Sequence, residues 1–157
     1  MTALPPATRL FTLDEANRTL PLVRLIVRDI VELYPAAQRR HERLAEIESE
    51  PPAPTPDGEA RYVSTVREMQ SELDDDQVRL RGYFEELDKI GAELKDPLVG
   101  LVDFPTVIDG EEACLCWKLG EESIGFWHRE EAGFAGRLPV DEADQIGPAG
   151  DDLEPLP

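Results

Sequence analysis

The chain has 157 residues, of which 34 are acidic and 16 are basic, and its formal net charge is −18. Proteins that bind nucleic acid or anionic membranes carry clustered Lys and Arg, so this composition argues against both partners. The charge favours a basic partner or a divalent cation instead. The length is that of one ordinary domain, which can bury a core without disulfide bonds.

Two cysteines, Cys114 and Cys116, are too few and too close together for the disulfide framework of a small secreted protein. Residues 1–10 lack the basic start and apolar stretch of a signal peptide, and we expect them to be flexible. No apolar run approaches the ~20 residues that cross a membrane. These features predict a soluble, cytoplasmic protein with reduced thiols.

Residues 12–95 have the pattern of a helical hairpin. Thr12 and Glu15 have the spacing of a capping box, and apolar residues then recur three and four positions apart along two long segments. Pro21 predicts a kink or a new helix start. Residues 51–58 contain four prolines and a glycine, so we expect a non-helical loop that joins two antiparallel helices.

Asp76 is a polar residue within the apolar pattern of the second helix. A loop centred near Thr55 would bring it close to Tyr34, whose hydroxyl could donate to the carboxylate and satisfy both groups. A buried acid poised for chemistry is one interpretation. A polar pair that fixes the register of the two helices is the interpretation that we favour, because single polar residues in heptad patterns commonly have that role.

After the hairpin the pattern changes to a period of two, which predicts a three-stranded antiparallel meander over residues 98–130. Asp109-Gly110 is a strong two-residue hairpin signal. A turn centred there pairs Phe104 with Leu115 and Val102 with Trp117. A Gly-rich loop at residues 131–139 should follow the meander, and we expect residues 140–157 to be an acidic, disordered tail.

The second turn of the meander is expected at Glu121-Glu122, and this turn pairs Leu115 with His128 and Trp117 with Phe126. Side chains alternate between the two faces of a strand, so these pairings assign every residue to a face. The face expected to pack on the helices is Val102, Phe104, Leu115, Trp117, Leu119, Ile124, Phe126 and His128. The face expected to point outward is Leu101, Asp103, Cys114, Cys116, Lys118, Trp127 and Arg129.

The predicted fold is therefore α+β: a long antiparallel two-helix hairpin packed with a small three-stranded meander, in a single domain at residues 11–139. Five segments resemble a bacterial family of domains of unknown function, number 2203, over about residues 11–139. They are Phe11–Asn17, Gly100–Pro105, Leu115–Trp117 with Gly120-Glu121, Trp127-His128, and Gly133–Arg137. The resemblance implies these domain limits and this order of elements, and it implies no activity. A Glu commonly follows the Trp-His pair in that family, whereas this chain has Arg129 there.

A metal site is one candidate chemistry, because Cys114, Cys116 and His128 carry groups that bind zinc. A closed zinc site needs four ligands, and the predicted registers place His128 on the opposite face of the sheet from both cysteines. The sequence therefore predicts no metal site and no cofactor.

A second candidate is an acid–base or anion-binding site at which His128 is close to Glu130, Glu131, Asp103 and Arg137. The alternative is a structural network that ties the Gly-rich loop to the edge of the sheet, and we favour it because most buried polar groups simply satisfy one another.

A third candidate is a binding surface on the outer sheet face, formed by Leu101, Asp103, Cys116 and Trp127, since exposed aromatic residues mark partner sites. The C-terminal part of the chain could instead cover this face. The leading functional hypothesis is a non-enzymatic binding or assembly protein that uses the hairpin or this face, with a homodimer or another protein as partner. The alternative is a small-ligand or metal-dependent enzyme with a site around His128, Glu131 and Arg137.

Overall fold

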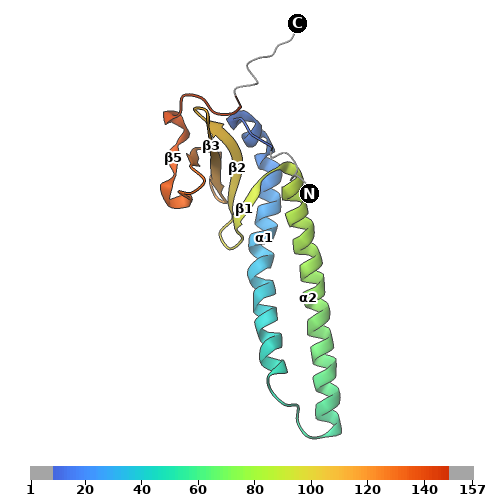
Figure 1. The fold of residues 1–157 in the computed structure, drawn as a ribbon. Helices are drawn as coiled ribbons and strands as arrows, with labels where there is room; N and C mark the ends of the chain where they lie inside the picture. Colours follow the sequence, from blue (N-terminus) through green and yellow to red (C-terminus); the bar gives the residue numbers. More distant parts are fainter. Residues whose placement is uncertain (1–8, 149–157) are drawn as a thin grey trace, which may run out of the picture.

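The computed structural model describes residues 9–148, which form two long helices and one antiparallel sheet (Figure 1). Helix α1 (Leu13–Glu48) and helix α2 (Pro56–Ile90) lie side by side as a hairpin. The sheet contains β1 (Glu93–Asp96), β2 (Leu101–Ile108), β3 (Glu111–Lys118), β4 (Phe126–His128) and β5 (Leu138–Pro139), in that spatial order. The α+β prediction is confirmed, although the sheet has five strands rather than three.

The helix ends follow from local chemistry. Thr12 and Glu15 form the predicted capping box, in which each side chain accepts from the backbone amide of the other residue. Helix α1 continues through Pro21 and Pro35, so of the two outcomes predicted at Pro21, a kink or a new helix start, the new start is wrong. Helix α2 begins at Pro56, inside the segment predicted to be loop, because proline in the first turn lacks only an amide that would be unpaired there.

Helix α2 ends earlier than predicted, at Ile90, because Gly91 takes a left-handed conformation with φ of 99°. Residues 93–96, predicted as the end of the helix, form strand β1 instead. The main core lies between the sheet and the halves of the helices nearest to it, and it includes Phe104, Trp117 and Trp127. Beyond the sheet the hairpin continues as a long two-helix arm (Figure 1). Neither helix, within the described part of the chain, is long and apolar enough to cross a membrane.

The register of the sheet is predicted correctly at one turn and wrongly at the other. Strands β2 and β3 pair Phe104 with Leu115 and Val102 with Trp117, as the Asp109-Gly110 turn predicts. Strands β3 and β4 pair Leu115 with Trp127, whereas the prediction paired Leu115 with His128. This shift by one residue reverses the face of every side chain on β4.

The shift moves Trp127 into the core and brings His128 to the opposite face, where it is the Cα partner of Cys114. The predicted outward surface of Leu101, Asp103, Cys116 and Trp127 is therefore not one surface. Trp127 packs on the helix side, and Asp103 and Cys116 are buried on the other side.

The C-terminal part of the domain also differs from the prediction. Residues 140–148 are predicted to belong to a disordered tail, but they begin with a short 3-10 helix, and the segment around Ile146 pairs with the end of strand β2. Ile146 forms a β-bridge with Ile108, and the Gly147 amide donates to the Val107 carbonyl at 2.8 Å. Residues 1–8 of the N-terminus predicted to be flexible and residues 149–157 of the predicted tail lie outside the described residues.

The polar residue in the hairpin also has a different partner from the one predicted. Asp76 is buried, and Arg40 Nη1 donates to its two carboxylate oxygens at 2.7 and 2.6 Å. Arg40, rather than Tyr34, therefore satisfies the carboxylate. The pair joins α1 to α2, which agrees with the structural role that we favour for Asp76.

Candidate metal centre

Three neighbouring strands bring Asp103, Cys114 and His128 together on the sheet face that points away from the helices. Asp103 lies on β2, Cys114 on β3 and His128 on β4. Their side chains are almost completely buried, with relative exposures of 3%, 7% and 3%. One ligand atom from each residue lies within 4.8 Å of the other two.

The hydrogen bonds of His128 define which ring nitrogen is available to a ligand. Its Nδ1 lies 2.7 Å from the carbonyl oxygen of Arg129, which can only accept, so Nδ1 carries a proton. Its Nε2 faces Asp103 Oδ1 at 3.0 Å. A neutral imidazole protonated on Nδ1 would place two acceptors face to face there. The contact therefore requires a second proton or a metal cation between the two groups.

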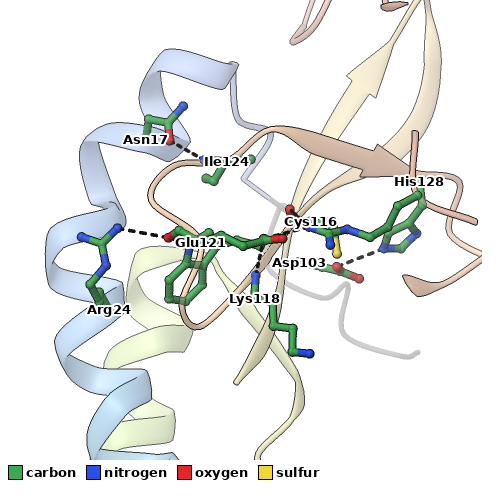
Figure 2. Close-up of polar contacts among 10 residues, drawn as sticks. Asn17, Arg24, Asp103, Cys116, Lys118, Glu121, Ile124 and His128 are labelled. Carbon is green, nitrogen blue, oxygen red and sulfur yellow. Dashed lines mark hydrogen bonds and ion pairs between the residues drawn. The ribbon is translucent and has the colours of Figure 1, made fainter. Parts of the chain in front are cut away.

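This hydrogen bond to the Arg129 carbonyl is the kind of contact that orients a metal-binding histidine. Such histidines almost always donate their other ring N–H to a carbonyl or carboxylate, which fixes the ring and its tautomer. The imidazole of His128 thus presents Nε2 to the cluster in the form that a metal ion requires. Figure 2 shows the side chains of His128 and Asp103 directed toward each other from adjacent parts of the sheet.

The two thiols are unreactive in the absence of a metal. Burial, together with the negative charge of Asp103, raises the pKa of Cys114 to about 12 and the pKa of Cys116 to about 12. Both cysteines are free rather than disulfide-bonded. Cys116 is the cross-strand partner of Asp103, and the interaction of its thiol with this carboxylate contributes to the raised pKa of Cys116.

Arg137, one of the predicted site residues, lies close to this face but has other partners. Its guanidinium donates to Glu121 Oε1 at 2.8 Å and to the Cys116 carbonyl at 3.3 Å, and it stacks on Phe126 and Phe134. Burial opposes ionisation of Glu121, but the hydrogen bonds from Arg137 and the Lys118 amide keep its pKa below the ordinary value. Arg137 therefore anchors the Gly-rich loop over the sheet.

Glu131, the third predicted site residue, is exposed. His128 and Arg137 have separate partners, Asp103 for the histidine and Glu121 for the arginine. The geometry therefore supports the structural network at Arg137 and separates it from the cluster around His128.

The connection between β3 and β4 explains why the cluster does not follow from the sequence. Arg24 on α1 donates to the Glu122 carbonyl at 2.8 Å. It also lies 3.5 Å from the Glu121 carbonyl, and Asn17 on α1 accepts from the Ile124 amide at 2.9 Å (Figure 2). The chain therefore turns at Leu119–Gly120 and continues as a loop held by the helix, instead of forming a single two-residue turn at Glu121-Glu122. Sequence reasoning groups His128 with the two cysteines as one candidate and with Asp103 as another, but the wrong register places His128 on the other face.

The cluster fits a small metal ion. Ligand bonds of 2.0–2.3 Å in a tetrahedral site place ligand atoms roughly 3.3–3.8 Å apart. The 3.0 Å separation of His128 Nε2 and Asp103 Oδ1 is slightly shorter than this range, and all three ligand atoms lie within 4.8 Å of one another, so metal binding would bring the more distant atoms closer by up to roughly 1.0–1.5 Å. Thiolate, imidazole and carboxylate together suit Zn²⁺ and other borderline divalent ions.

Comparison with known proteins gives a family but no activity. No curated protein and no solved structure matches the chain significantly. A family model described as an uncharacterized conserved protein, DUF2203, matches residues 9–140. The match covers both helices, the sheet and the cluster described above. The chain therefore belongs to the DUF2203 family of uncharacterized conserved proteins.

Proposed function

We propose that this protein is a non-enzymatic binding protein whose ligand is a divalent transition-metal ion, held by Asp103, Cys114 and His128. The observation that carries the proposal is the convergence of three different ligand atoms within 4.8 Å on adjacent strands. The orientation of His128 through its Nδ1 hydrogen bond supports it independently. Zn²⁺ is the ion that this mixed donor set suits best.

Binding rather than catalysis is supported by the surroundings of the cluster. All three side chains are buried, and neither Glu131 nor Arg137 contributes a free acid, base or anion-binding group beside His128. The two reduced cysteines also support a cytoplasmic location, because that compartment keeps thiols available for metal binding.

The affinity of the site should depend steeply on pH. Since burial raises the pKa of Cys114 to about 12, its thiol must lose a proton when the metal binds. Metal binding also displaces the proton that the His128–Asp103 contact requires in the metal-free protein, so the association constant should rise up to about a hundredfold per pH unit below that pKa. Zinc titrations of the metal-free protein between pH 6.5 and 8 would measure this slope.

The test uses the full chain purified without chelators, its metal content, and titration of the metal-free protein with Zn²⁺ against a coloured chelator. Asp103→Asn is the informative variant. Its amide N–H can donate to His128 Nε2 and its oxygen can accept from the Cys116 thiol, so both contacts survive without the charge. We expect stability within about 1 kcal/mol of the wild type and at least tenfold weaker zinc binding.

Glu131→Gln is the matched control, because it removes one negative charge from an exposed position near the cluster. It should bind zinc as the wild type does. A wild-type protein that takes up no metal, or an Asp103→Asn variant that binds zinc with unchanged affinity, would contradict the proposal.

Assembly through the hairpin is the second candidate function, and the packing of the two-helix arm supports it. Between residues 36 and 72 only Leu44 is buried, whereas heptad residues such as Tyr62, Val66 and Met69 are only partly covered. A second copy of the chain would cover these side chains by packing its own arm alongside. This role is independent of the metal centre.

A further inference from the structure

A small hollow beside Cys114, next to the candidate metal centre, is lined by acidic side chains. The cavity has a volume of about 180 Å³, and Cys114 lines it together with Glu93, Glu112 and Glu130. Metal cations are attracted to such a concentration of carboxylates, and a mixed thiolate–imidazole–carboxylate site normally has four ligands. We therefore expect a fourth metal ligand among the side chains that line the hollow.

The strand register favours Glu93 over Glu112. Glu93 on β1 is the Cα partner of Asp103 on β2, and cross-strand partners of this kind have Cβ atoms about 4.5–5.5 Å apart on the same face. The side chain of Glu93 therefore lies beside Asp103, on the same face of the sheet as the cluster. Glu112 lies two residues before Cys114, at the exposed end of β3 and farther from Asp103.

The side chain of Glu93 is free to move toward the cluster. It is half exposed, and its carboxylate forms a surface ion pair with Lys95 Nζ at 3.2 Å. Exposed pairs of this kind contribute ~0–1 kcal/mol, so a metal ion can displace the lysine at little cost. Burial opposes the charged form of Lys95, but its hydrogen bond to Glu93 and the nearby charge of Asp103 raise its pKa.

The opposite side of the cluster is less suited to a cation. Cys116 is the second thiol on this face, but the Arg137 guanidinium donates to the Cys116 carbonyl and places a fixed positive charge there. On the Cys114 side the carboxylates of Glu93 and Glu130 act on the thiol together with Asp103. A metal cation bound by Glu93 is therefore repelled less by nearby positive charge than a metal cation bound by Cys116.

We infer that Glu93 is the fourth ligand and that the metal centre is a closed site of Asp103, Cys114, His128 and Glu93. This inference rests on the proposed metal-binding function. In the metal-bound protein the Glu93 carboxylate leaves Lys95 and coordinates the ion from the side of the hollow. A site with four protein ligands has no open position for water, so it holds a metal ion rather than using it for hydrolysis.

The experiment compares Glu93→Gln and Glu93→Ala with Glu112→Gln, which makes the same charge change at another wall of the hollow. Each full-length, metal-free variant is titrated with Zn²⁺ in competition with a chelator, and the visible spectrum of its Co²⁺ form is recorded. We expect both Glu93 variants to bind zinc at least tenfold more weakly and to show a changed cobalt spectrum. Glu112→Gln should change the affinity less than threefold and leave the spectrum as in the wild type.

Lys95→Gln gives a change in the opposite direction, because it frees Glu93 from its ion pair and should strengthen zinc binding. If Glu93→Gln and Glu112→Gln weaken zinc binding equally and both keep the wild-type cobalt spectrum, the loss of affinity comes from the removed negative charge alone. That result would overturn the assignment of Glu93. Wild-type affinity and spectrum in Glu93→Ala would overturn it too, while the metal site itself would stand. Only failure of the wild type to bind zinc would remove both this inference and the proposed function.

Discussion

At the residue scale, the candidate metal centre depends on a few buried polar groups on one face of the sheet. Asp103 interacts with His128 and with the Cys116 thiol, and it is the side chain on which the arrangement converges. Its burial would be unfavourable without these partners, since an isolated buried carboxylate is costly. Either protons or a metal ion can compensate the negative charge of these buried groups. Protons and metal ions therefore compete for the cluster, so metal binding depends on pH.

The raised pKa values of the two thiols predict that the folded protein loses stability in alkaline solution. Burial raises the pKa of both Cys114 and Cys116 to about 12, so the folded protein retains protons that the unfolded chain releases near pH 8.5–9. Their contribution to stability is thus complete below about pH 8.5 and decreases as the pH rises toward 12. The loss is at most about 1.4 kcal/mol per pH unit for each thiol.

Urea unfolding of the metal-free protein at pH 7, 9 and 10 would measure this effect. The double variant Cys114→Ala/Cys116→Ala should lose less stability between pH 9 and 10 than the wild type, although its stability at pH 7 can differ. The same pH dependence in both proteins would show that the thiols do not titrate differently on folding.

At the element scale, the packing of the sheet on helix α1 depends on a close approach at Gly100. This glycine precedes strand β2 with φ of 79°, a conformation that favours glycine. A Cβ atom there would lie 2.8 Å from Leu119 Cβ and 2.9 Å from Val27 Cγ1. Both the backbone conformation and the contact with α1 therefore require the absence of a side chain.

Gly100→Ala should destabilise the protein by about 2–4 kcal/mol, the sum of backbone strain and overpacking. Gly110→Ala is the matched control, because Gly110 has a similar φ of 87° and a Cβ atom added there would have no neighbour within 4 Å. It should lose only about 1–2 kcal/mol. Urea unfolding of both variants would give these values, and equal losses would show that the contact with α1 adds nothing.

At the scale of the whole molecule, the protein consists of a compact end that contains the sheet and a two-helix arm that extends from it (Figure 1). The candidate metal centre lies in the compact end, whereas the arm buries little of its own apolar surface. The two parts can therefore have separate roles, metal binding at one end and assembly along the other.

Assembly through the arm predicts that the protein is a dimer at micromolar concentration in sedimentation experiments. Val63 is exposed on the arm, and Val63→Lys should shift the protein toward monomer by placing a charge in the contact. Leu22→Lys is the control, since Leu22 is similarly exposed but lies on α1 outside the arm. A wild-type monomer at this concentration would contradict the assembly role.

Local signals in the sequence are sufficient for the helices and for one turn of the sheet. The capping box at Thr12, the heptad pattern and the Asp109-Gly110 turn each depend on residues close together in the chain, and each is confirmed or nearly so. Strands β1 and β5 are missed because each is short and carries no alternating apolar pattern. They are strands only because a neighbouring strand supplies their hydrogen bonds.

The candidate site, by contrast, is decided by tertiary structure. Phe126 and Trp127 are both apolar, so the alternation rule cannot tell which of them faces the core. Asn17 and Arg24 on helix α1 hold the loop before β4, and these distant contacts set the register. The sequence by itself determined an acidic α+β domain with a helical hairpin, and it named the candidate ligand residues. Only the tertiary structure brought Cys114 and His128 to the same face, because a shift of one residue in a strand reverses the direction of all its side chains.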